Sequence, residues 1–343
     1  MRYLPAPADL NQLRDQATDL LQAAQRGDPG ASAQIGAVSE TQTLPAAQLA
    51  LARDYGFPSW SAMQAEVERR TILNLRDVDG LRRLVADQPD MARRPLARFG
   101  DHRRGVEPLA LVAMLRFEAR GAGLSNDLPG TGAMAQALID AGAPVEGGPG
   151  VRETPLITAA SYGDVEVAAV LIAAGADLDA RAAADSGGVS GGTALEHAAV
   201  FGMTDVLDAL VAAGARVESL EMAAAVGNVS GWSLNEADEQ TRLRALVFAA
   251  DHQRPDVVRA LVSAGTDVNT ADAQWHRLPL HTAAAHGRPA SVRLLLELGA
   301  DPDLRDPEHG RTPLEWCYPE NRYRSHPGHD GVDRILRPVT AAP

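Results

Sequence analysis

Apolar residues recur along much of the chain at the spacing of short amphipathic helices. In residues 278–303, an alanine-rich run follows Pro279, and a second apolar run then places Val292 and Leu296 on one helix face. Proline is tolerated in the first turn of a helix, and glycines such as Gly287 and Gly299 end helices in the left-handed conformation. The pattern therefore predicts two short helices joined by a glycine turn.

The same pattern returns several times. The glycines that close the second helix stand 33, 39, 51 and 34 residues apart: Gly142, Gly175, Gly214, Gly265 and Gly299. With Thr-Pro-Leu at residues 154–156 and Leu-Pro-Leu-His at 278–281, the unit resembles the ankyrin repeat, whose period is about 33 residues. This resemblance implies an all-α ankyrin-repeat solenoid. The 51-residue interval indicates either a truncated repeat or a long insertion.

Residues 1–70 precede the repeats and predict four helices, over 9–25, over 30–38, from Pro45, and from 59 to about 69. The segment 47–63 resembles one that often precedes ankyrin repeats in bacterial proteins. We therefore expect an N-terminal helical cap with Phe57 and Trp60 in its core. Residues 71–343 then hold about six ankyrin-like repeats, irregular at 91–130 and 219–243.

Composition narrows the range of functions. The net charge is −13, which argues against nucleic acid or an anionic membrane as the main partner. The chain has no lysine, which excludes Schiff-base chemistry and a phosphate-binding loop lysine. It has one cysteine, and no apolar run approaches the roughly 20 residues of a membrane span. We expect a soluble, cytoplasmic protein without a cofactor or metal. The five arginines of residues 93–104 indicate either an anion site or a solvated, salt-bridged loop.

The repeat phase selects candidate site residues. In proteins that this chain resembles, the positions before the mid-repeat glycine, and the finger before the Thr-Pro-Leu-His motif, face a concave groove. The corresponding residues form a set of mostly ring-bearing side chains: Tyr162, Phe201, Asp251, His252, Trp275, His276 and His286. Rings with polar atoms suit ligand contact. We therefore expect a module that binds a protein or peptide partner through this groove.

A second hypothesis uses part of the same set. Asp251, His252 and His286 could supply general acid–base groups to a cofactor-free hydrolase, isomerase or cyclase acting on a small molecule. No established catalytic motif accompanies them. The histidine of the Thr-Pro-Leu-His position, His281, is expected to bond neighbouring backbone. His197 is expected to be a hydrogen-bonded core residue, with a catalytic role beside Glu196 as the alternative.

Overall fold

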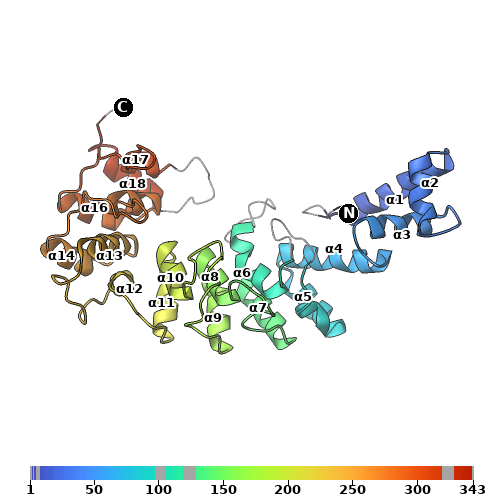
Figure 1. The fold of residues 1–343 in the computed structure, drawn as a ribbon, viewed down its shortest axis with the longest axis horizontal. Coiled ribbons are helices and arrows are strands. Elements are labelled where there is room, and N and C mark those ends of the chain that lie inside the picture. Colours follow the sequence, from blue (N-terminus) through green and yellow to red (C-terminus); the bar gives the residue numbers. More distant parts are fainter. Residues whose placement is uncertain are drawn as a thin grey trace. The chain divides into compact units, whose positions relative to one another are not determined.

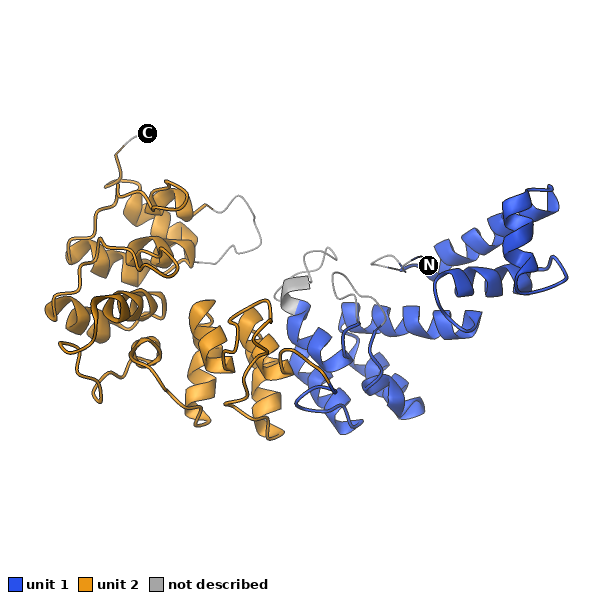
Figure 2. Ribbon diagram, in the orientation of Figure 1, with its two compact units in different colours: residues 1–149 blue, residues 150–343 orange. Residues whose placement is uncertain are grey.

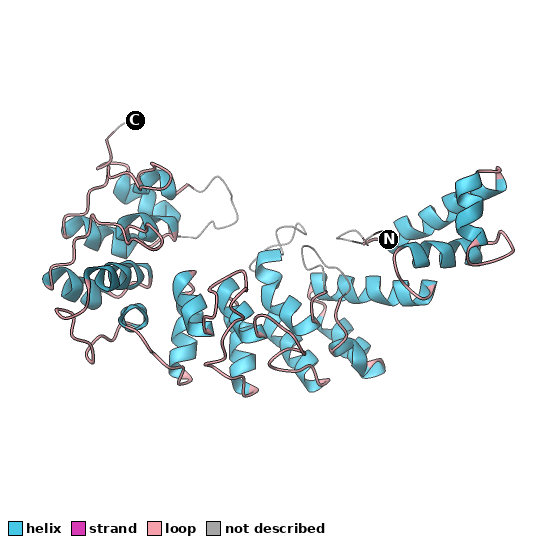
Figure 3. Cartoon of the chain, in the orientation of Figure 1, coloured by secondary structure: helices cyan, strands magenta, loops and turns pink. Residues whose placement is uncertain are grey.

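The computed structural model describes residues 2, 4, 8–96, 105–118, 129–318 and 328–341. Every extended regular element within these ranges is a helix, accompanied by two isolated β-bridges (Figure 3). The predicted all-α fold is confirmed. Two compact units make up the chain, residues 1–149 and 150–343 (Figure 2). None of the described helices combines the length and the apolar character that a bilayer crossing requires.

Unit 1 begins with the four helices expected from the sequence: α1 (Leu10–Gln25), α2 (Pro29–Gly36), α3 (Leu44–Asp54) and α4 (Trp60–Leu75) (Figure 1). Each starts with an Asp, Thr or Ser whose side chain accepts a backbone N–H of the first turn. Phe57 and Trp60 pack, half-buried, against a core that includes Leu13 and Met63. Since α4 runs unbroken through residue 70, the boundary expected there falls inside a helix.

The remainder of unit 1 holds α5 (Val78–Asp87), the 3₁₀-helix η1 (Pro89–Ala92), α6 (Pro108–Glu118) and α7 (Thr131–Asp140). A buried ion network ties α4 to η1. Glu66 bonds Arg69 at 2.5 Å and Arg70 at 3.0 Å, and Arg69 also donates to the Met91 carbonyl. Of the arginines proposed as an anion site, Arg98, Arg103 and Arg104 lie outside the described residues.

Unit 2 is a stack of short helices in pairs. Its helices are α8 (Pro155–Tyr162), α9 (Val165–Ala173), α10 (Ala194–Val200), α11 (Thr204–Ala212), α12 (Leu220–Val226), α13 (Glu239–Asp251), α14 (Pro255–Ser263), α15 (Pro279–Ala285), α16 (Pro289–Glu297), α17 (Pro313–Trp316) and α18 (His329–Leu336). The first helices of successive repeats pack in the order α8, α10, α12, α13, α15, α17. Thr154, Thr193 and Thr312 cap three of them.

One repeat of unit 2 lacks its second helix. Helix α12 is followed by a non-helical segment, residues 228–238, and then by α13, which is itself the first helix of the next pair. Val229, Leu234 and Ala237 of this segment pack against the core. The 51-residue interval is therefore a truncated repeat, in which a loop stands where a second helix would be.

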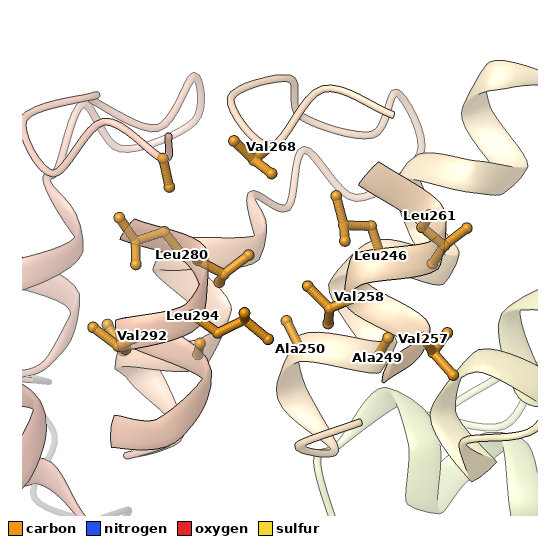
Figure 4. Packing of buried hydrophobic residues seen from close by; sticks show 14 of the residues in the cluster. Leu246, Ala249, Ala250, Val257, Val258, Leu261, Val268, Leu280, Val292 and Leu294 are labelled. Carbon is orange, nitrogen blue, oxygen red and sulfur yellow. The ribbon is translucent and has the colours of Figure 1, made fainter. Parts of the chain in front are cut away.

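Small aliphatic side chains fill the interior of these repeats (Figure 4). Leu246 and Ala250 of α13, Val258 of α14 and Leu280 of α15 belong to one buried cluster. All four are at most 2% exposed. Because alanine lets helices approach closely, few aromatic residues are needed inside, and most of the rings of unit 2 are left for its surface.

Candidate functional site

Two of the predicted site residues, Asp251 and His252, lie at the end of α13 and have no exposed surface. His252 Nε2 donates to the Ala199 carbonyl at 3.0 Å, and its Nδ1 accepts from the Thr204 hydroxyl at 3.0 Å. Burial lowers the pKa of His252, so the ring is neutral near pH 7. The expectation that Asp251 and His252 line an open surface is wrong, because both fill an interior contact with α10 and α11.

Asp251 holds an ion network at the same place. Its carboxylate accepts from His286 Nδ1 at 2.8 and 2.9 Å and from Arg288 Nε at 3.5 Å. Burial alone would raise the pKa of the Asp251 carboxyl, but His286 and Arg288 hold that pKa well below its usual range. The carboxylate is therefore ionised, with its charge balanced inside the fold.

The end of α10 receives further donors from distant repeats. Arg277 Nη1 donates to the Val200 carbonyl at 3.0 Å, and Arg288 Nη2 donates to the Gly202 carbonyl at 2.6 Å. The last carbonyls of a helix have no partners within it, and cations near them are stabilising. We call this cluster the α10 junction: Ala199, Val200, Gly202 and Thr204 on one side, and Asp251, His252, Arg277, His286 and Arg288 on the other.

The truncated repeat explains the junction. Without a second helix after α12, residues at the end of α13 and after α15 reach α10 and α11 directly, across 48 to 86 residues of sequence. Arg254, at the start of α14, likewise donates to the Ala225 carbonyl of α12 at 2.8 Å and pairs with Asp208 of α11. Side-chain hydrogen bonds thus supply the contacts that a helix would otherwise make.

Other histidines of unit 2 are also bonded to backbone. His281 Nε2 donates to the Arg311 carbonyl at 3.0 Å, and His197 Nε2 donates to the Val189 carbonyl at 3.1 Å while its Nδ1 accepts from Ser161 at 2.8 Å. Both rings are buried, and burial lowers the pKa of each. The structural roles expected for His197 and His281 are confirmed.

The acid–base hypothesis finds little support in this geometry. A general base must reach the proton that it removes, yet His252 has both nitrogens bonded and no exposed surface. Asp251 is enclosed as well, and only His286 of the three reaches the surface, with 16% of its side chain exposed. The three residues are close together, as predicted, but they join two repeats rather than surround a cavity.

Two fingers of unit 2 share one construction. Asp272 accepts the backbone N–H groups of Gln274, Trp275 and Arg277 at 2.8 to 2.9 Å. In the next finger, Asp306 accepts those of Glu308, His309 and Arg311 at 2.6 to 3.0 Å. Each buried carboxylate therefore organises a turn around itself.

The two turns present rings and guanidiniums at matching positions. Trp275 packs against Phe248, with ring centroids 5.9 Å apart, and the Arg277 guanidinium lies 5.5 Å from the Trp275 ring. Beside the second finger, Trp316 Nε1 of α17 donates to Asp306 at 3.0 Å, and the Trp316 ring meets His309 edge-on, with ring centroids 5.3 Å apart. We call these residues the finger surface: Trp275, His276, Arg277, His309, Arg311 and Trp316.

Comparison with known proteins agrees with the repeat geometry. The family model described as ankyrin repeats (3 copies) matches residues 130–221, 220–306 and 246–324. Together these matches cover more than half of the chain. The chain belongs to the ankyrin repeat family. Ankyrin repeats are generally protein–protein interaction modules.

A solved structure, the human ASB11 ankyrin repeat domain, is similar to this ankyrin repeat protein over 80% of this chain and 97% of that one, with 21% identity and a TM-score of 0.36. No curated protein matches the chain.

The remaining ring residues lie on the ankyrin repeats as follows. Tyr162 and Phe201 are half-buried at the ends of α8 and α10, with Phe201 6.1 Å from the His197 ring. Trp275 is half-buried and His276 is exposed, both in the finger before α15. Since Arg277 bonds Val200, that finger lies beside the end of α10, where Phe201 follows. The predicted set is therefore divided between an interior junction and a surface.

Sequence reasoning missed Arg254 and Arg288, which connect the ankyrin repeats across the truncated one. A signal was available, because each arginine directly precedes the proline that starts a second helix. This shared Arg-Pro position indicates a common role. The Trp316–Asp306 bond was also missed, since ten residues and a turn separate the two in sequence.

Proposed function

We propose that unit 2 is an ankyrin-repeat binding module whose protein or peptide partner docks on the finger surface. Tyr162, Phe201 and His286, half-buried at the ends of first helices, extend the contact. The partner binds by burying rings and guanidiniums, and no chemical step is involved.

The observation that carries this proposal is the shared construction of the two fingers. Asp272 and Asp306 each hold three backbone N–H groups, so Trp275 and His309 project from rigid turns. Side chains that are already ordered lose little conformational entropy on binding. Trp and Arg are also the residue types that contribute most to interfaces. The first finger combines Trp275 with Arg277, and Trp316 of α17 bonds the carboxylate that organises the second finger, which carries Arg311.

Backbone strain in the first finger gives further support. His276 has φ of +52°, whereas the equivalent residue of the second finger is Gly310, with φ of +65°. A non-glycine residue in this region costs about 1–2 kcal/mol. An exposed residue that costs stability beside Trp275 is consistent with selection for contact rather than for folding.

The test begins with peptides selected on the wild-type protein from a random display library. Their affinities are then measured by calorimetry for wild type, Trp275→Ala and Arg311→Ala. We expect each variant to lose about 2 kcal/mol of binding free energy, or about thirtyfold in Kd. Arg293→Ala, on the exposed side of α16, is the matched control and should bind as wild type does.

Circular dichroism melts establish that the variants remain folded. Folded Trp275→Ala and Arg311→Ala proteins that bind the selected peptides with unchanged affinity would refute the finger surface as the binding site. Loss of affinity in Arg293→Ala to the same degree would refute it too, because the effect would then not depend on the fingers.

A further inference from the structure

The loop of the truncated repeat presents a tryptophan to solvent. Residues 228–238 are anchored from inside by Val229, Leu234 and Ala237, which pack on the core. Arg242 of α13 donates to the Leu234 carbonyl at 3.5 Å and to the Ala237 carbonyl at 2.6 Å. Trp232, between these anchors, is 38% exposed. The loop thus holds its backbone in place and turns its largest apolar side chain outward.

This loop lies in the most acidic part of the chain. Residues 150–250 contain 14 acidic residues and five arginines, whereas residues 251–343 contain 13 acidic residues and 11 arginines. All five arginines of the first stretch already have partners: Arg152 with Asp185, Arg181 with Glu218, Arg216 with Asp179, Arg244 with Glu221, and Arg242 with loop carbonyls. Arg254, from the following stretch, pairs with Asp208, and residues 150–250 still carry more carboxylates than arginines.

Carboxylates adjoin the exposed ring in sequence. Glu236 and Glu239 are exposed, and neither forms an ion pair within the described part of the chain. Asp238 lies between them and caps α13 through Thr241. One short segment thus combines an exposed indole with three carboxylates. The arginines that adjoin it are already engaged, Arg242 with loop carbonyls and Arg244 with Glu221.

We propose that the Trp232 loop is a second docking surface, which binds a basic peptide segment of a partner protein through arginine or lysine side chains. A cation placed over the indole face is attracted by the ring, most strongly for tryptophan, and the exposed Glu236 and Glu239 supply opposite charge from the same segment. A guanidinium suits the site better than an ammonium because its plane stacks on the ring and its N–H groups match a carboxylate.

Charge complementarity selects this partner over the alternatives. An acidic peptide or nucleic acid meets repulsion from the unneutralised carboxylates. A wholly apolar partner gains only the single exposed ring, since Val229 and Leu234 already face the core. The Trp232 loop shares no residue with the finger surface, so variants of one leave the side chains of the other unchanged.

The experiment uses the full chain and a short fluorescein-labelled peptide of alternating arginine and glycine, with matched lysine and glutamate peptides. Fluorescence anisotropy is read at about 0.15 M salt, where surface charges more than about 8 Å apart are screened. We expect the arginine peptide to bind more tightly than the lysine peptide, and the glutamate peptide not to bind. Trp232→Ala should weaken arginine-peptide binding about five- to tenfold, and Trp232→Phe less.

Charge variants separate a local site from general attraction to an acidic protein. Glu236→Gln with Glu239→Gln should weaken binding about threefold or more, as loss of exposed ion pairs predicts. Glu297→Gln with Asp330→Asn removes the same charge from α16 and α18 and should leave Kd unchanged, as should Trp275→Ala.

Three results would overturn the proposal. They are equal binding of the glutamate peptide, equal loss of affinity in the two charge-matched double variants, and unchanged affinity in folded Trp232→Ala. If Trp232→Ala does not fold, the affinities of Trp232→Phe and of the two charge-matched double variants test the proposal instead.

Discussion

The α10 junction predicts that Gly202→Ala destabilises unit 2 far more than the same change at an equivalent backbone position. Gly202 has φ of +72° and Gly163 has φ of +73°, and each follows the first helix of a repeat. A Cβ at Gly202 would lie 2.7 Å from His286 Nδ1 and 3.0 Å from Asp251 Oδ2. A Cβ at Gly163 would lie 2.6 Å from Met203 Sδ, the flexible part of a side chain that can move aside.

The magnitude follows from two contributions. Alanine at positive φ costs about 1–2 kcal/mol at either site. At Gly202 the methyl group also displaces the hydrogen bond from His286 to the buried Asp251 carboxylate, which costs about 1.5–3 kcal/mol. We therefore expect Gly163→Ala to cost about 1–2 kcal/mol and Gly202→Ala to cost about 2.5–5 kcal/mol.

Urea unfolding followed by circular dichroism measures both variants against wild type. Gly175→Ala, at φ of +84° with open space around the added methyl, reports the backbone contribution alone. If Gly202→Ala costs no more than Gly163→Ala, the His286–Asp251 contact contributes nothing to stability and the reasoning fails.

Further predictions follow from the buried histidines and from the strained finger. Removing the ring in His252→Ala leaves a cavity and leaves the Ala199 carbonyl without its donor, so the free energy of unfolding in urea should fall by about 2–4 kcal/mol. An unfolding midpoint equal to that of wild type would mean that the ring is not part of the core. Burial lowers the folded-state pKa of His197, His252 and His281. As pH falls below about 7, these histidines therefore take up protons in the unfolded chain before they do in the folded protein. The free energy of unfolding should then decrease between about pH 7 and 5, by up to about 1.4 kcal/mol per pH unit for each ring. The pKa of Asp251 is depressed instead, so the stability that this carboxylate contributes is lost only below about pH 4. Unfolding midpoints that do not change between pH 8 and 5 would contradict the prediction that the three buried histidines are neutral in the folded protein. His276→Gly should relieve the positive φ, raising the unfolding free energy by up to about 1 kcal/mol, whereas a lower melting temperature would show that the imidazole contributes to the fold.

Helix spacing and glycine phase were sufficient to predict the repeats, because both depend on local backbone preferences. Thr193 and Thr312 cap helices, and Gly163 and Gly202 turn the chain, as short-range rules require. The long gap before Gly265 was recognised as a truncation or an insertion. Choosing between them needed the packing of α13 as a first helix, which sequence spacing does not contain.

The candidate site was predicted less well, for a physical reason. Phase along a repeat indicates which direction a side chain points, and it assumes that each repeat contacts a complete neighbour. His252 and Phe201 share a phase, but the missing second helix allows the end of α13 to reach α10, and His252 is buried there. Trp275 and His276 lie in a finger that reaches α10 through Arg277, and they remain half-buried and exposed, respectively.

The α10 junction also has a consequence for how unit 2 unfolds. Repeat arrays usually couple only nearest neighbours, so terminal repeats can fray while the others persist. Here Arg288 donates to Gly202 across 86 residues, and Arg277 donates to Val200 across 77, which couples repeats that are not adjacent in the array. Fraying from the C-terminal end that passes α15 removes donors from α10 at the same moment. The repeat that has lost a helix is therefore where we expect folding cooperativity to extend beyond adjacent repeats.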